Sequence, residues 1–191
     1  MNLNRRAATL GIGLAVVGAM EARGAEGDHV HPMVLTSGDS WFRLIIAGYQ
    51  FPNNTTDEWD SNWLIIDGSV RLNGKEWRFR DPCLTAFEAE DLADWLEACA
   101  LGKATHPYCA LTEPNLQFDL VDPQTMRVSF ALESAPPWAK QGDDWTKHGF
   151  NLGVGPALVK AASELRHQLQ DFPVRGGRNH GGTATTPSQD S

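Results

Sequence analysis

An Asn-Gly pair is the feature that most restricts how this chain can fold. Asn73 and Gly74 separate two segments, residues 63–72 and 75–80, in which apolar and polar side chains alternate. Asn-Gly is the strongest two-residue signal for a tight β-hairpin. The two segments are therefore expected to form antiparallel strands, and the alternation in the second predicts a sheet with one face exposed to water.

Two amphipathic helices are expected, each following a group of strands. Thr85-Ala86-Phe87-Glu88 has the spacing of a capping box, in which the hydroxyl and the carboxylate each satisfy a free backbone donor. Gly102 ends this first helix. Pro156 suits the first turn of the second helix, because its missing N–H is not needed there, and Pro173 ends that helix.

Four further segments complete the pattern. Strands are expected at residues 41–47, 116–120, 126–132 and 150–154, where apolar side chains recur at every second position. The order is then three strands and a helix, followed by three strands and a helix. The sequence predicts an α+β fold, with an antiparallel β-sheet of about six strands in βββα-βββα order and two α-helices packed on one face.

The length of 191 residues suits one domain rather than two. Residues 33–172 are expected to form this single α+β domain. Residues 173–191 are rich in Gly, Arg, Ser and Thr and lack the apolar content to fold, so a disordered tail is predicted. Residues 1–32 are expected to lie outside the fold.

The N-terminal extension has two interpretations. Arg5-Arg6 precedes an apolar stretch, so residues 1–25 resemble a twin-arginine export signal, which predicts a periplasmic protein. The stretch is too short and too rich in glycine for a stable membrane span. Alternatively, translation begins at Met33 and the extension is a mis-assigned start, which predicts a cytoplasmic protein.

The sequence contains none of the motifs that mark common enzymes. A nucleophile elbow, a phosphate-binding glycine loop, a zinc-protease helix and a dinucleotide fingerprint are all absent. Cys83, Cys99 and Cys109 are too widely spaced for a usual structural zinc site, and their odd number favours a reducing compartment. The close pair of His106 and Cys109 is interpreted as part of a loop. No enzyme activity, cofactor or metal is predicted.

One catalytic alternative stays open. Cys83 follows a strand near the start of a helix, where a thiolate would be stabilised. A nucleophile also needs a base, and His148 is the candidate for this role in the folded region. A thiol in the core is the preferred interpretation of Cys83. An unrecognised hydrolase would have to use Cys83 or the carboxylates of Asp57 and Asp60.

The predicted domain is acidic. The whole chain has a formal charge of −8, and residues 33–172 carry 20 acidic against 11 basic side chains. Such a field repels nucleic-acid phosphates and attracts basic surfaces. Direct binding of nucleic acid is therefore disfavoured, and a basic protein partner is favoured.

A partner-binding surface is predicted where the acids cluster. One cluster is a loop in which acids flank a tryptophan, a residue type that is frequent at interface hot spots. The other is the polar face of the first helix. A solvated loop and an ordinary helix surface are the alternative interpretation. The predicted surface comprises Asp57, Glu58, Trp59, Asp60, Glu90, Asp91, Asp94 and Glu97.

A series of short motifs resembles a known family. In chain order these are GYQFP at residues 48–52, DSNWL at 60–64, Trp77 followed by DPCL at 81–84, LADWL at 92–96 and TEPNL at 112–116. The series resembles the WapI-type immunity proteins of bacterial contact-dependent competition systems. The resemblance runs from Met33 to the second helix.

The resemblance implies a non-catalytic protein that binds and neutralises the C-terminal toxin domain of a large secreted polymorphic toxin. In the namesake case the toxin is a tRNA-cleaving nuclease, which must be basic to hold RNA, so an acidic inhibitor suits it. The resemblance assigns no contact residues, and the predicted surface rests on charge. Immunity to an RNA-cleaving toxin belongs in the cytoplasm. Export would instead indicate a periplasmic binding module of unknown ligand.

Overall fold

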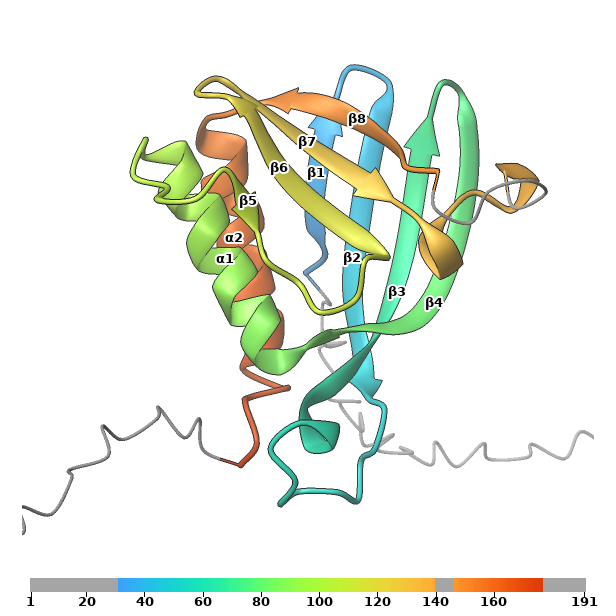
Figure 1. Ribbon diagram of the computed structural model, residues 1–191, viewed down its shortest axis with the longest axis vertical. Coiled ribbons are helices and arrows are strands. Elements are labelled where there is room, and N and C mark those ends of the chain that lie inside the picture. The colour runs from blue at the N-terminus through green and yellow to red at the C-terminus, as the bar shows by residue number, and fades with distance from the viewer. Residues whose placement is uncertain (1–30, 140–145, 177–191) are drawn as a thin grey trace, which may run out of the picture.

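Two four-stranded antiparallel sheets and two helices make up residues 31–139 and 146–176, which are the parts of the chain that the computed structural model describes (Figure 1). The predicted α+β class and antiparallel pairing are confirmed. The strands form two sheets rather than one, and there are eight rather than about six. Residues 1–30, with the signal-like segment, and residues 177–191 of the predicted tail lie outside the described parts.

The element order is four strands and a helix, followed by four strands and a helix. The first sheet has the order β1 (Met33–Ser37), β2 (Ser40–Tyr49), β3 (Trp63–Leu72) and β4 (Lys75–Thr85), and α1 (Ala86–Ala100) follows it. The second has the order β5 (Tyr108–Cys109), β6 (Leu116–Asp122), β7 (Thr125–Phe130) and β8 (His148–Gly153), and α2 (Pro156–Leu169) follows it. Short 3₁₀ turns are η1 (Asp60–Asn62), η2 (Leu132–Ser134) and η3 (Pro137–Ala139).

The two strands missing from the sequence prediction are β1 and β5. β1 has only five residues, of which Met33 and Leu35 are buried, and Gly38 turns the chain into β2 with a φ of 54°. β5 pairs with β6 through two residues only. Segments this short carry too little alternation to stand out, so their place in a sheet depends on their neighbours.

The hairpin at Asn73 and Gly74 is confirmed, with φ angles of 51° and 77°. The prediction that β4 ends at Asp81-Pro82 is wrong, because the strand continues to Thr85. Its pairing with β3 shifts register there, and Pro82 lies in the resulting bulge. A bulge accepts proline because its residues need not donate to the ladder.

The predicted capping box holds the start of α1. The Thr85 hydroxyl accepts from the Glu88 N–H at 3.3 Å, and the Glu88 carboxylate accepts from the Thr85 N–H at 2.9 Å. The same buried carboxylate accepts from the Thr112 N–H at 2.5 Å, which ties the start of α1 to the segment before β6. Pro156 opens α2 as expected. Among the described residues, no helix is both long and apolar enough to cross a membrane.

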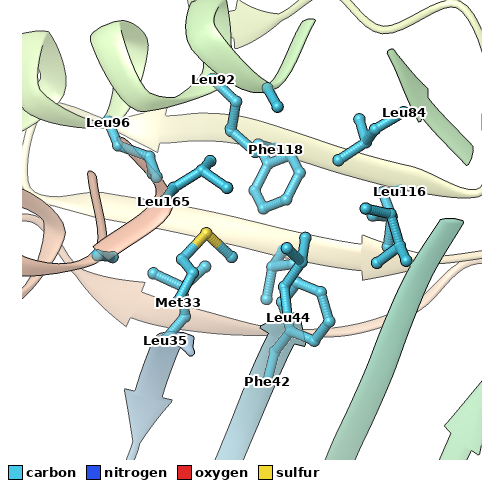
Figure 2. Close-up of a cluster of buried hydrophobic side chains, with 14 of the residues drawn as sticks. Met33, Leu35, Phe42, Leu44, Leu84, Leu92, Leu96, Leu116, Phe118 and Leu165 are labelled. Carbon is cyan, nitrogen blue, oxygen red and sulfur yellow. The ribbon is translucent and has the colours of Figure 1, made fainter. Parts of the chain in front are cut away.

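One core joins both sheets and both helices. The helices pack side by side and cover one side of the sheets, as expected (Figure 1). The centre of the Phe130 ring on β7 lies 5.0 Å from the centre of the Phe42 ring on β2 and 5.7 Å from that of the Trp77 ring on β4. Figure 2 shows Leu92 and Leu165, from the two helices, pointing into the same cluster. Each sheet therefore buries its inner face against the other sheet and the helix pair.

The segment after α2 holds the loop between β2 and β3, residues 50–62. The Arg175 N–H donates to the Asn62 side-chain oxygen at 2.8 Å, and the Asn62 amide donates to the Arg175 carbonyl at 2.8 Å. The same Asn62 amide group also donates to the Glu58 carbonyl at 2.8 Å. We call residues 173–176 the C-terminal latch.

The Arg175 side chain of the latch also contacts the loop and Tyr49. Its guanidinium donates to the backbone carbonyls of Phe51, Pro52 and Asn54 at 3.4, 3.2 and 3.1 Å. It also lies 3.4 Å from the centre of the Tyr49 ring, a cation–π contact. The ordered contacts therefore continue past residue 172, where the predicted domain ended.

Phe130→Ala is expected to lower the free energy of unfolding by about 3–5 kcal/mol, because it opens a cavity between the two sheets. Urea denaturation followed by circular dichroism measures this loss. Phe51→Ala is the matched control, since the Phe51 side chain is 42% exposed and its removal should cost little. Equal losses in the two variants would contradict a core centred on Phe130.

Arg175→Ala is expected to loosen the β2–β3 loop, because it removes three hydrogen bonds and a ring contact. Amide hydrogen exchange, followed by mass spectrometry of peptides covering residues 50–62, should become about ten-fold faster or more. Arg127→Ala is the control, because it removes a half-buried arginine of the second sheet that donates to Asn151 at 3.0 Å. Unchanged exchange in Arg175→Ala would show that the latch does not restrain the loop.

Candidate partner-binding surface

The predicted acidic loop is exposed and has a fixed backbone. Asp57, Glu58, Trp59 and Asp60 are all exposed. The Asp57 carboxylate accepts from the N–H groups of Trp59 at 2.8 Å and Asp60 at 2.6 Å, and Asn54 accepts from the Asp57 N–H at 3.2 Å. Side-chain acceptors of this kind fix turns. Asp57 therefore shapes the loop, on which Trp59 remains 55% exposed.

A ring contact joins this loop to the start of α1. The Trp59 ring meets the Phe87 ring edge-on, with centroids 5.2 Å apart. The loop accordingly lies beneath the end at which α1 begins, at the lower end of the molecule in Figure 1. The loop cluster thus lies next to the start of the helix that carries the other cluster.

The predicted acids of α1 continue from this contact along the helix. Glu90, Asp91 and Asp94 are exposed, and Glu97 is half-buried. Spacings of three and four residues place Glu90, Asp94 and Glu97 on one helical strip. We call the loop residues 57–60, Phe87 and these four acids the acidic surface.

Part of the negative charge of the acidic surface is neutralised by an arginine of the neighbouring helix. Arg166 of α2 lies 2.8 Å from the Asp94 carboxylate and 2.6 Å from that of Glu97. These two hydrogen-bonded carboxylates raise the pKa of the guanidinium, which therefore stays charged. Asp94 and Glu97 thus form surface ion pairs between the two helices. Compared with Asp94 and Glu97, the acids beside the Trp59–Phe87 contact therefore contribute more of the negative electrostatic field that a partner would meet.

Three residues that shape the surface were absent from the sequence prediction. Phe87 is half-buried in the first turn of α1, and its place four residues before Asp91, on the same helical strip, is the signal that could have included it. Arg166 and Arg175 belong to a later helix and to the segment after it. Their roles arise from contacts across 72 and 113 residues of sequence, which local patterns do not encode.

Cys83 is a core thiol, as preferred in the sequence analysis. It is fully buried, and burial, with the nearby Asp81 charge, raises its thiol pKa far above the usual range. Burial also raises the thiol pKa of Cys99 to about 11 and that of Cys109 to about 12. A neutral buried thiol is a poor nucleophile, so the geometry gives no support to a cysteine hydrolase.

The described residues contain no group of three or more His, Cys, Asp or Glu side chains placed to hold a metal ion. His106 is exposed at the end of α1, where its carbonyl accepts from the Trp95 indole at 3.1 Å. The segment that contains His106 and Cys109 therefore connects α1 to β5 and packs on Trp95.

The comparisons with known proteins identify a family. The model of the immunity protein WapI-like family matches residues 33–173, which include all eight strands, both helices and the acidic surface. No curated protein and no solved structure matches the chain. Because the family match covers most of the chain, this protein belongs to the WapI-like family of immunity proteins.

Proposed function

We propose that this chain neutralises a cognate bacterial toxin domain by binding it one-to-one through the acidic surface, without catalysis. The family match over residues 33–173 is the observation that carries the proposal. The toxin we infer is the C-terminal domain of a polymorphic toxin in a contact-dependent competition system. A basic, tRNA-cleaving nuclease is the target that the charge of this chain fits.

Electrostatic attraction supports this choice of target. A nuclease that grips RNA presents a basic cleft, and an acidic inhibitor approaches it faster than a neutral one. On the acidic surface, Asp60 and Glu90 flank the Trp59–Phe87 contact, while no basic side chain pairs with either of them within the described residues. Both carboxylates would meet the toxin near the aromatic pair.

The fixed loop supports tight binding as well as fast approach. Ordering a mobile loop during association costs free energy, which a loop ordered beforehand avoids. Asp57 and the C-terminal latch already hold this loop from its two sides. Trp59 would then serve as the aromatic anchor, surrounded by charges that select a basic partner.

The proposed compartment is the cytoplasm, with translation starting at Met33, because an inhibitor of a tRNA-cleaving enzyme must meet it there. The alternative is export to the periplasm through the twin-arginine segment in residues 1–25, for a binding module of another ligand. The observation that favours the alternative is Arg5-Arg6 followed by an apolar stretch.

The toxin fragment encoded beside the gene is expected to bind the purified chain in a one-to-one complex that abolishes cleavage of tRNA. Asp60→Lys and Glu90→Lys should each lower the association rate constant by roughly ten-fold at low salt, because each reverses a charge at the acidic surface. Surface plasmon resonance at several salt concentrations measures these rates.

Asp39→Lys is the matched control for this experiment. It makes the same charge change in the turn between β1 and β2, at the opposite end of the molecule (Figure 1). A toxin that does not bind the wild-type chain would refute the proposed function. A toxin that binds all three variants equally would keep the function but move the interface elsewhere.

The mass of the native protein in fractionated cells is expected to correspond to a chain that begins at Met33 and stays in the cytoplasm. Intact mass spectrometry of cytoplasmic and periplasmic fractions gives both the start and the compartment. A periplasmic chain cleaved near residue 25 would instead favour the exported binding module.

A further inference from the structure

The outer face of the first sheet carries arginines in cross-strand rows. The register of β2, β3 and β4 creates three rows on this face, each with one residue per strand. The rows are Trp41–Arg71–Glu76, Arg43–Ser69–Arg78 and Ile45–Asp67–Arg80. This side of the sheet therefore carries four guanidinium groups and two carboxylates, so it is basic although the whole chain is acidic.

The middle row differs from its neighbours in charge balance. In the row on one side, Arg71 lies 3.6 Å from Glu76, and in the row on the other side Arg80 lies 2.8 Å from Asp67. The middle row has an arginine on either side of Ser69 and no acid, and neither arginine forms an ion pair within the described residues.

This arrangement does not help the sheet. Cross-strand pairs stabilise a sheet when their charges are opposite, and the middle row contains no such pair. An acid at position 69 would compensate both arginines, as Asp67 compensates Arg80 in the next row. The uncompensated charge of Arg43 and Arg78 is therefore available to a ligand.

The surface is hollowed at this row. A hollow of about 520 Å³ is lined by Arg43, Ile45, Asp67, Gly68, Ser69, Arg78, Phe79 and Arg80. A second hollow, of about 200 Å³, is lined by Trp41, Arg43, Ser69, Glu76, Trp77 and Arg78. The two hollows share Arg43, Ser69 and Arg78. The short side chain of Ser69, between two long ones, is part of the lining that both share.

We propose that Arg43, Ser69 and Arg78 form a binding site for a phosphate dianion, either free phosphate or the phosphate group of a small organic ester. Two guanidinium forks and a hydroxyl offer donors to several oxygens at once, and arginine suits phosphate geometry. The two uncompensated positive charges match a dianion better than the single charge of a carboxylate. Each hollow has one acid in its lining, and each acid is paired with an arginine of its own row: Asp67 with Arg80 at 2.8 Å and Glu76 with Arg71 at 3.6 Å.

The site is independent of toxin binding. It lies on the outer face of the first sheet, whereas the acidic surface is formed by the β2–β3 loop and α1. If phosphate does not bind here, the immunity proposal stays intact. If the toxin does not bind, phosphate binding at this site can still be measured directly.

An NMR titration of the full chain with inorganic phosphate tests the proposal. The spectra follow backbone amides and arginine side-chain N–H groups, and chloride holds the ionic strength constant so that screening does not change. We expect saturable shifts at Ser69, Arg43 and Arg78. Arg43→Gln and Arg78→Gln should each weaken binding roughly ten-fold, the effect of losing a charged hydrogen bond.

Arg127→Gln is the control, because it removes a positive charge from the second sheet, on β7. Parallel titrations with adenosine monophosphate and with glutamate distinguish an organic phosphate ester, free phosphate and a carboxylate as the ligand. Tighter binding of the monophosphate than of inorganic phosphate assigns an organic ester, and equal binding assigns the free anion. No saturation with phosphate, equal affinity in the arginine variants, or glutamate binding as tight as phosphate would each overturn the proposal.

Discussion

The contact between the two sheets determines where every other surface of the molecule lies. Phe130 meets Phe42 and Trp77 across the sheets, and the helix pair closes the remaining apolar side. Because these inner faces are buried together, the polar face of the first sheet and that of α1 must both turn to solvent. The core thereby separates the charges, with arginine rows outside the first sheet and acids on the loop and α1.

Local signals in the sequence were sufficient to predict most elements of the fold. The turn at Asn73, the cap at Thr85 and the helix start at Pro156 each satisfy a backbone requirement that neighbouring residues express directly. The division into two sheets has no such signal, since alternation shows which side chains point inward but not which strands pair. Pro82 illustrates the limit, because a bulge formed with β3 allowed the strand to continue past it.

The residues of the candidate surface were proposed from the sequence, but their pairing with basic residues was not. The acids of the loop and of α1 were visible in sequence, and the Trp59–Phe87 contact joins them. How far each acid is paired depends on residues far along the chain, since Arg166 pairs with Asp94 and Glu97 across the helix interface. A charge count treats all carboxylates alike, whereas in the fold some of them are paired with an arginine of the other helix.

The latch also has a consequence for the order in which the protein matures. Residues 51–62 are synthesised long before Arg175, which lies 113 residues after Asn62 and 124 after Phe51. A chain emerging from the ribosome can pair β2 with β3 early, and Asn62 can bond to the nearby Glu58 carbonyl, yet the contacts with Arg175 must wait until α2 has been made. The β2–β3 loop, part of the proposed toxin-binding surface, therefore gains its last contacts only after the second helix has been made.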